Sequence, residues 1–289
     1  MATYVTSDAH GHLRALDRVL EQVGLGARDT LYVLGDMVDR GPDPVGVLRL
    51  VRSLPNTVVL AGNHEAMMLE GVRASSDVGR GDWLLNGGFA TSDQLGRLGA
   101  AQADDLLDWV AHLPLFAVVE VPECRTSMHA GERRVHLLAH AGIDARRLRT
   151  ALAESGAVPG ASGGYGHVDA ARLIDAMDEQ YVDDLQWIRR GFWDVPTGLV
   201  GRDGRGPVVV AGHTPSLTLG RFAELTCGTG IDECGRGVVV EVGATRDTGG
   251  VPDRICVDCS AAAGWPHGRV GIMRLEDRRV WYADIEQGE

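Results

Sequence analysis

One apolar segment of this chain runs into a short stretch that carries two carboxylates and an arginine. Residues 31–34 (Leu-Tyr-Val-Leu) are short and rich in strand-forming side chains, so they predict a buried strand. Residues 35–41 then read Gly-Asp-Met-Val-Asp-Arg-Gly. Buried carboxylates are costly unless they are paired or bind a metal. This strand end therefore predicts part of a site for a metal and an anion.

The same arrangement is repeated along the chain. Four other strand-like runs end in a small residue and then a potential metal ligand, in the segments Asp8-Ala9-His10, Asn63-His64-Glu65, His140-Ala141-Gly142 and His213-Thr214. In open α/β sheets, ligands bind outside the carboxyl ends of the strands. We therefore expect the five segments to meet at one edge of a sheet and to form a single site.

Length and charge exclude several classes of protein. A chain of 289 residues can form one large α/β domain or two small ones. The net charge of −12 argues against a general surface for nucleic acid or anionic membrane, although a local metal would still permit a phosphate substrate. No apolar run approaches the roughly 18 residues of a membrane span. No signal peptide is expected, and five cysteines, an odd number, favour a reducing cytoplasm.

The order of apolar patterns predicts one domain over residues 1–289. Strand and helix patterns first alternate, with Gly24 as the expected end of the first helix and Pro44 as the start of the second. Residues 66–112 carry helical patterns and predict a helical insertion. Residues 220–254 are rich in glycine and threonine and contain two of the cysteines.

The candidate ligands suit a pair of divalent first-row metals. They comprise two carboxylates, one amide and three imidazoles: Asp8, His10, Asp36, Asn63, His140 and His213. Asp36 could bridge the metals, because a carboxylate has several lone pairs. Asp8 and His10 would complete one metal site, and the remaining three residues would complete the other. Two metals about 3.5–4 Å apart can hold a hydroxide for in-line attack on phosphorus, so the set predicts phosphoester hydrolysis.

Three further residues are placed to act on the substrate. The guanidinium of Arg40 matches phosphate oxygens in pairs, which makes it a candidate anion clamp. His64 follows Asn63 directly and could protonate a leaving alkoxide. Asp39 could fix the tautomer of His64 through a hydrogen bond.

Each of these residues alone has a simpler explanation. Asp36 would suit a helix N-cap, and Asn63 would suit a turn. His140 and His213 would more often be hydrogen-bonded core histidines. Arg40 would more often form a surface ion pair of little energetic value. The convergence of five segments is what favours a site.

These segments resemble the five signatures of calcineurin-like metallophosphoesterases. They are more closely similar to the phosphoprotein phosphatase branch, which includes bacterial serine/threonine phosphatases and symmetrical diadenosine tetraphosphate hydrolases. The matching motifs span residues 8–214. The resemblance implies an α/β fold, a four-layer αββα sandwich of two mixed β-sheets flanked by helices. It also implies a dinuclear centre of Mn, Fe or Zn.

Three weaker matches extend the resemblance. Residues 83–88 (Trp-Leu-Leu-Asn-Gly-Gly) resemble a stretch common in bacterial members. Residues 185–189 resemble a segment whose arginine contacts phosphate, which makes Arg189 a second clamp. Residues 256–260 lie where relatives have an Asp-Thr-Gly-like turn, here altered. The segment 220–254 looks like an insertion relative to compact members, and it could be a lid, a docking surface or a loop.

The cysteines leave several alternatives open. Four of them, Cys227, Cys234, Cys256 and Cys259, could form a structural zinc site, although the spacing of the first pair is loose. A disulfide between Cys227 and Cys234 is another possibility. Ordinary thiols are the preferred interpretation.

The leading hypothesis is a metal-dependent phosphomonoesterase that uses Mn²⁺ and acts on phosphoserine, phosphothreonine or phosphotyrosine in proteins. The first alternative is a hydrolase of diadenosine tetraphosphate or another small phosphoanhydride, which would share the metal site. A phosphodiesterase or nuclease on the same scaffold is disfavoured by the acidic charge and by Arg40 and Arg189, which favour a terminal phosphate. A non-catalytic binding module is disfavoured by the combination of an acid with anion clamps. We expect a phosphorylated protein or small phosphate ester as the substrate, and neither nucleic acid nor membrane as a partner.

Overall fold

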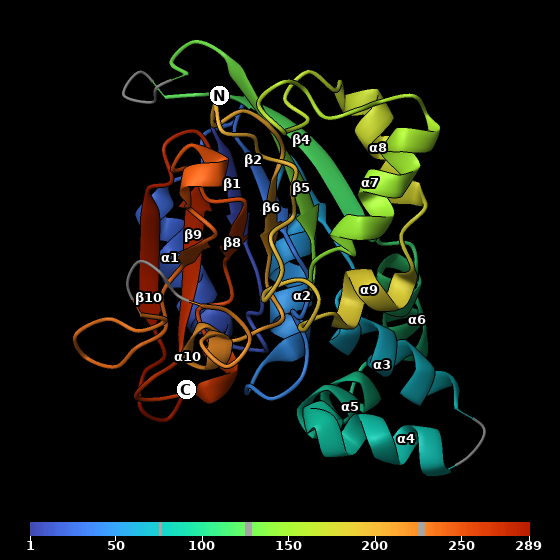
Figure 1. Cartoon of the computed structure of the whole chain (residues 1–289). Helices are drawn as coiled ribbons and strands as arrows, with labels where there is room; N and C mark the ends of the chain where they lie inside the picture. Colours follow the sequence, from blue (N-terminus) through green and yellow to red (C-terminus); the bar gives the residue numbers. More distant parts are fainter. Residues whose placement is uncertain (75–76, 125–128, 225–228) are drawn as a thin grey trace.

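Two five-stranded sheets form the centre of the computed structural model, which describes residues 1–74, 77–124, 129–224 and 229–289 (Figure 1). The first sheet has the order β10-β9-β1-β2-β3, with β1 at Thr3–Thr6, β2 at Thr30–Val33, β3 at Thr57–Val59, β9 at Arg269–Arg274 and β10 at Val280–Asp284. The second has the order β4-β5-β6-β8-β7, with β4 at Phe116–Pro122, β5 at Arg133–Ala139, β6 at Val208–Ala211, β7 at Val240–Val242 and β8 at Arg254–Cys256.

Both sheets are mixed, as the resemblance implies. β1, β2 and β3 are parallel, whereas β9 is antiparallel to β1 and to β10. In the second sheet β5, β6 and β8 are parallel, and the edge strands β4 and β7 are antiparallel to their neighbours. The parallel strands carry the candidate ligand segments at their carboxyl ends, where α/β sheets bind ligands.

Helices cover the outer faces of the sheets, which confirms the predicted four-layer sandwich (Figure 1). Their bounds are α1 Leu13–Val23, α2 Pro44–Ser53, α3 Asn63–Arg73, α4 Asp77–Trp83, α5 Phe89–Gly96, α6 Ala100–Ala111, α7 Ala145–Glu154, α8 Ala170–Asp178, α9 Val182–Trp187 and α10 Ser216–Leu219. One apolar cluster joins α1 and α2 to the first sheet, and another joins α7 and α8 to the second. A third cluster, which includes Val5, Leu34 and Leu138, lies between the sheets.

Local signals set the helix boundaries that the sequence predicts. α1 ends before Gly24, whose φ of 61° is in the left-handed region that glycine adopts at low cost. α2 begins with Pro44, and the side chain of Asp43 before it accepts a hydrogen bond from the backbone N–H of Gly46. Both predicted boundaries are confirmed.

Helices α3 to α6 lie against one end of the sandwich (Figure 1). A π-helix, η1 (Leu84–Gly88), joins α4 to α5, and within it Gly87 has a φ of 111°. None of the helices in the described ranges is long and apolar enough to cross a membrane.

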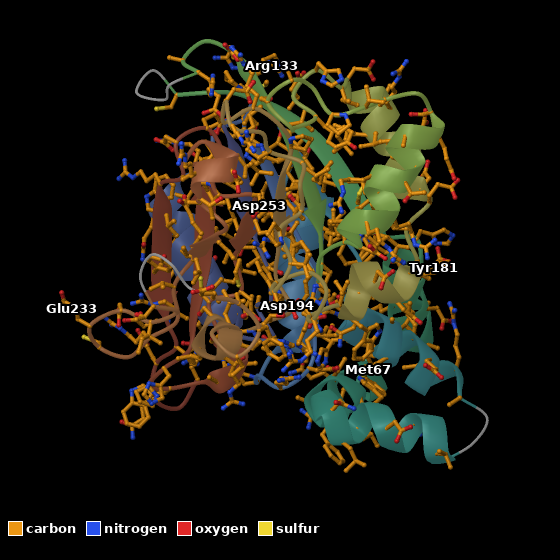
Figure 2. The ribbon with its side chains drawn as sticks, viewed as in Figure 1. Met67, Arg133, Tyr181, Asp194, Glu233 and Asp253 are labelled. Atoms are coloured by element: carbon orange, nitrogen blue, oxygen red, sulfur yellow. The ribbon has the colours of Figure 1, made fainter. Side chains whose placement is uncertain are left out.

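The described part of segment 220–254 contains β7 and a short 3-10 helix at Arg246–Thr248. Before β7, a loop over residues 231–236 projects from the sandwich, and Glu233 lies at its tip (Figure 2). Asp232 holds the base of this loop through ion pairs to Arg236 (3.0 Å) and Arg269 (3.1 Å). The loop is therefore attached to the end of the first sheet, where Arg269 begins β9.

Replacing Leu138 with alanine should destabilise the protein strongly. Leu138 has no exposed surface and packs between the two sheets, so Leu138→Ala leaves a cavity and should lower the free energy of unfolding by about 2–5 kcal/mol. Urea denaturation would measure the change. Leu85→Ala is the matched control, because Leu85 is 83% exposed and its truncation should cost less than about 0.5 kcal/mol. Equal effects of the two variants would contradict the assigned core.

Candidate active site

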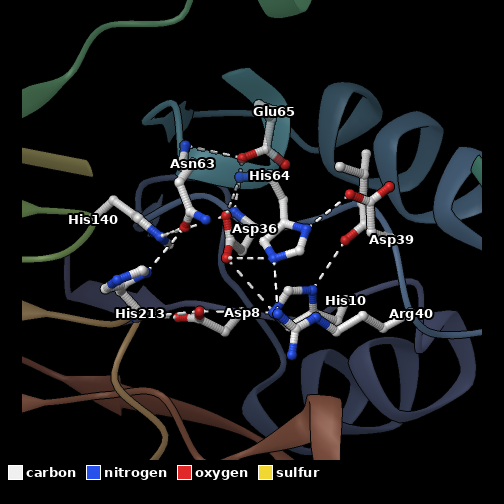
Figure 3. A network of polar contacts seen from close by, with 12 residues as sticks. Asp8, His10, Asp36, Asp39, Arg40, Asn63, His64, Glu65, His140 and His213 are labelled. Atoms are coloured by element: carbon white, nitrogen blue, oxygen red, sulfur yellow. Dashed lines mark hydrogen bonds and ion pairs between the residues drawn. The ribbon is translucent and has the colours of Figure 1, made fainter. Parts of the chain in front are cut away.

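The six predicted metal ligands come together at the carboxyl ends of five strands (Figure 3). Asp8 and His10 follow β1, Asp36 follows β2, Asn63 follows β3, His140 follows β5 and His213 follows β6. All six side chains are buried. Ligand atoms lie within 4.8 Å of one another in two groups, one of His10, Asp36 and His64 and one of Asp36, His140 and His213.

The loops that carry these residues have a strained backbone. Nine non-glycine residues have positive φ in the part of the chain that the structure describes, and six of them belong to this site: Asp8 (54°), His10 (42°), Asp36 (52°), Asp39 (69°), Arg40 (69°) and His213 (63°). The left-handed conformation costs roughly 1–2 kcal/mol per residue. Such strain persists where surrounding contacts impose it, and it concentrates at functional sites.

Glu65 supplies one of the contacts that impose this geometry. Its buried carboxylate accepts hydrogen bonds from the backbone N–H groups of Asp36 (2.8 Å), Met37 (2.8 Å) and Gly62 (2.9 Å). The loop after β2 is thereby fixed to the start of α3. Sequence reasoning assigned no role to Glu65. The sequence feature that could have indicated this role is the position of Glu65 three residues after the N-cap of α3, where glutamate closes a capping box.

The first ligand group is arranged around His10. Nδ1 of His10 lies 3.0 Å from the carbonyl oxygen of Val38. Because a carbonyl can only accept, Nδ1 carries the proton and Nε2 keeps a free lone pair. That lone pair faces Oδ2 of Asp36 at 3.6 Å and Oδ1 of Asp8 at 4.0 Å. Three electron-pair donors therefore converge, as a cation site requires.

In the second ligand group, unprotonated imidazole nitrogens and side-chain oxygens also converge. Nδ1 of His140 lies 2.7 Å from the carbonyl oxygen of Leu34, so Nε2 is unprotonated in the neutral ring. This Nε2 faces Oδ1 of Asn63 at 2.9 Å and Oδ1 of Asp36 at 3.4 Å. Nδ1 of His213 also lies 2.9 Å from Oδ1 of Asn63, and Nε2 of His213 is buried with no hydrogen-bond partner. These nitrogen and oxygen atoms could bind a second cation. Asp36 presents one carboxylate oxygen to each ligand group.

Burial controls the charges of these ligands. It raises the pKa of the Asp8 and Asp36 carboxyls well above their usual range, and nearby carboxylates raise both further. It lowers the pKa of His10 and His213, and it lowers the pKa of His140 to about 3. The imidazoles are therefore neutral, which is the form that binds metals. The carboxylates need nearby positive charge to stay ionised, and a divalent cation would supply it.

His64 is hydrogen-bonded to a charged side chain at each of its ring nitrogens. Nδ1 lies 2.7 Å from Oδ2 of Asp39, and Nε2 lies 3.0 Å from Nη2 of Arg40 (Figure 3). Since a guanidinium only donates, Nε2 accepts and Nδ1 donates to Asp39. His64 is thus oriented by a carboxylate and covered by a guanidinium, which suits proton transfer better than metal ligation.

Arg189 lies on the other side of the cluster. Its Nη2 is 3.4 Å from the carbonyl oxygen of His213. The side chain is half-buried, and burial lowers its pKa although the charges of Asp258, Asp8 and Asp36 oppose this effect. The two predicted clamps, Arg40 and Arg189, are therefore associated with opposite ligand groups.

The altered turn at residues 256–260 keeps a tight geometry. Ser260 has a φ of 65°, and its backbone N–H donates to Oδ1 of Asp258 at 2.8 Å. Its Oγ lies 3.2 Å from Oγ of Ser216 and accepts from the backbone N–H of Leu217 at the same distance. Asp258 is buried, and burial raises its pKa to about 6. Side-chain hydrogen bonds thus stabilise a left-handed turn without glycine.

The cysteines give no support to a zinc site. In residues 1–74, 77–124, 129–224 and 229–289, the groups that could hold a metal contain no cysteine. Cys256 and Cys259 are buried, and burial raises the pKa of both thiols, which disfavours thiolate ligands. Cys234 is exposed, and Cys227 lies outside the described residues.

Replacing Asp36 with asparagine should reduce the content of both metals, because the two carboxylate oxygens of Asp36 face different ligand groups. Elemental analysis after dialysis should give about two metals per chain for the wild type and a large loss for Asp36→Asn. Asp105→Asn is the control, since Asp105 is an exposed partner of Arg52. Unchanged metal content in Asp36→Asn would rule out a shared ligand.

Comparison with known proteins identifies a family and several relatives. A family model described as calcineurin-like phosphoesterase matches residues 1–234. The symmetrical bis(5'-nucleosyl)-tetraphosphatase of Proteus mirabilis (strain HI4320) is 39% identical over 145 residues, which are 50% of this chain and 45% of that protein. The protein with the same name from Marinomonas sp. (strain MWYL1) is 36% identical over 146 residues, with the same coverage. The chain thus matches about half the length of these curated relatives.

A solved structure, provisionally described as a diadenosine tetraphosphatase, has the same fold. Its TM-score is 0.53 at 19% identity, and the match covers 99% of this chain and 94% of that one. The family match extends over most of the chain and includes all five ligand segments. It confirms the resemblance, and the chain belongs to the calcineurin-like phosphoesterase family.

Proposed function

We propose that this chain is a metal-dependent phosphomonoesterase that acts on phosphoserine, phosphothreonine or phosphotyrosine in proteins. The observation that carries this proposal is the position of Arg40 and Arg189 beside the two ligand groups, together with His64. Two guanidinium groups can bind the free oxygens of a terminal phosphate. A diester has fewer such oxygens, so this arrangement favours a monoester.

The donor set would hold two divalent cations, with Asp36 shared between them. Asp8 and His10 would complete one site, and Asn63, His140 and His213 would complete the other. When bound, the metals supply Lewis-acid activation of the phosphoryl group and of the attacking water. Imidazole, carboxylate and amide ligands suit Mn²⁺, Fe or Zn²⁺, and we favour Mn²⁺.

The remaining residues would bind the phosphate and move a proton. Arg40 and Arg189 orient the phosphoryl oxygens and neutralise their charge. His64, once protonated, donates a proton from Nε2 to the leaving oxygen. Asp39 keeps Nδ1 of the same ring hydrogen-bonded and stabilises the imidazolium. Acid catalysis of this kind matters most for alkoxide leaving groups, such as serine and threonine side chains.

A second candidate function is hydrolysis of diadenosine tetraphosphate. The curated relatives that match half of the chain carry the name bis(5'-nucleosyl)-tetraphosphatase. Trp187 is 42% exposed, and its ring lies 6.0 Å from that of His213, nearly perpendicular to it. An exposed indole beside a candidate metal ligand offers a surface on which an adenine base could stack.

Initial rates of hydrolysis by the Mn²⁺-loaded protein would distinguish the two candidate functions. A phosphothreonine peptide, para-nitrophenyl phosphate and diadenosine tetraphosphate would be compared in parallel. The proposal requires a higher kcat/KM on the phosphopeptide than on the dinucleotide. The reverse preference would leave the site chemistry intact and assign the second function, and Trp187→Ala should then raise the KM for the dinucleotide selectively.

Replacing His64 with asparagine should slow the enzyme without removing its metals. Both ring nitrogens of His64 are already engaged by Asp39 and Arg40, so its loss should leave the metal content unchanged. The rate on a phosphothreonine peptide should fall about 10²–10⁴-fold, as expected for loss of a general acid. Loss of metal in His64→Asn would show that His64 is a ligand instead.

A further inference from the structure

Asp39, the partner of His64, also accepts hydrogen bonds from two side chains of the helical segment 77–96. Nε1 of Trp83 donates to both carboxylate oxygens, at 3.1 Å to Oδ1 and 3.0 Å to Oδ2. Oγ1 of Thr91 donates to Oδ1 at 2.6 Å. Asp39 and Thr91 have no exposed surface, and Trp83 is 2% exposed. These bonds are therefore shielded from water and stronger than surface hydrogen bonds.

The same segment also fixes the backbone of the loop after β2. The backbone N–H of Asp39 donates to Oγ1 of Thr91 at 3.0 Å. The backbone N–H of Arg40 donates to the carbonyl oxygen of Gly87 at 3.0 Å. Both residues have a φ of 69°, a conformation that needs such external support. The segment thus contacts the backbone as well as the side chain of the loop.

The indole of Trp83 is held in a slot that only glycines leave open. A Cβ atom on Gly71 would lie 2.6 Å from Cε3 of Trp83, and one on Gly88 would lie 2.5 Å from its Nε1. Such distances are too short for any side chain larger than glycine's. The indole N–H is therefore directed at Asp39 by close packing on two sides.

We propose that Trp83 and Thr91 are positioning residues of the catalytic apparatus. They hold the Asp39 carboxylate so that it orients His64 toward the leaving group. This inference rests on the proposed role of His64 as the acid. With Trp83 and Thr91 in place, Asp39 accepts from three side chains and keeps one orientation. Without them, a fully buried carboxylate would depend on His64 alone and could turn with it.

The effect of losing Trp83 or Thr91 on the rate of hydrolysis should depend on the leaving group of the substrate. An alkoxide leaves poorly and needs a proton in the transition state, whereas a dinitrophenolate leaves well without one. Loss of orientation at His64 should therefore slow phosphothreonine hydrolysis and leave dinitrophenyl phosphate hydrolysis nearly unchanged. A general loss of folding or of metal would slow both reactions equally.

The test compares Trp83→Phe and Thr91→Val with Thr91→Ser. Phenylalanine and valine keep most of the packing and remove the donor, whereas serine keeps the hydroxyl. We expect kcat for a phosphothreonine peptide to fall about 10-fold to 100-fold in the first two variants, less than in the full loss of the acid. KM, metal content and the rate on dinitrophenyl phosphate should stay close to wild type. Thr91→Ser should behave as wild type.

A second measurement does not use activity. In the metal-free protein, the proton on Nδ1 of His64 should give a low-field NMR resonance, because it is buried and bonded to Asp39. We expect this resonance to shift or broaden in Thr91→Val and Trp83→Phe and to persist in Thr91→Ser. Thr91→Val is nearly isosteric, so it keeps the test decisive if the tryptophan variant folds poorly.

The outcomes separate this inference from the proposed function. If His64→Asn slows the phosphopeptide selectively but Thr91→Val and Trp83→Phe do not, the positioning role is overturned and the acid stands. If the two variants slow both substrates equally, their role is structural and the inference fails. If His64→Asn itself shows no dependence on the leaving group, the acid role fails, and the positioning role fails with it.

Discussion

The carboxylate of Asp36 joins the two halves of the site. Its Oδ2 lies 3.6 Å from His10, which follows the first sheet, and its Oδ1 lies 3.4 Å from His140, which follows the second. It is only 2% exposed, and a buried carboxylate is stable only where positive charge or hydrogen-bond donors compensate its desolvation. Packing one sheet on the other therefore creates both the ligand cluster and its need for cations.

The loops around this carboxylate are held by polar contacts, whereas the sheets beneath them are held by apolar packing. Side chains such as Val5 and Leu138 fill the space between the sheets and bring the strand ends to fixed positions. The loops then adopt left-handed conformations that would be unfavourable in isolation. Glu65 on one side and Thr91 on the other bond directly to their backbone N–H groups, so the strain is supported by buried hydrogen bonds.

The chain as a whole is acidic, whereas two arginines lie beside the candidate metal ligands. The chain as a whole has a net charge of −12, which opposes binding of long polyanions. At the site, Arg40 and Arg189 are associated with opposite ligand groups. Local positive charge of this kind suits a phosphate that is small or exposed at the end of a chain.

Local sequence patterns were enough to predict the fold class and the candidate metal ligands. Strand-like runs that each end in a ligand are local patterns, and their order along the chain was enough to predict convergence at one sheet edge. The sequence also indicated Arg40 and His64, because both are adjacent to ligand segments. It assigned no partner to Trp83, although the segment around it matched a known pattern.

The partners of these side chains follow from the packing of the elements and not from local sequence patterns. His64 lies close to Asp36 and His10, and its bonds to Asp39 and Arg40 are the contacts that favour the proposed acid role over metal ligation. The donors to Asp39 come from 44 and 52 residues away in the chain. No periodic pattern encodes such pairs, because hydrogen-bond partners depend on distances and directions that exist only after the elements pack.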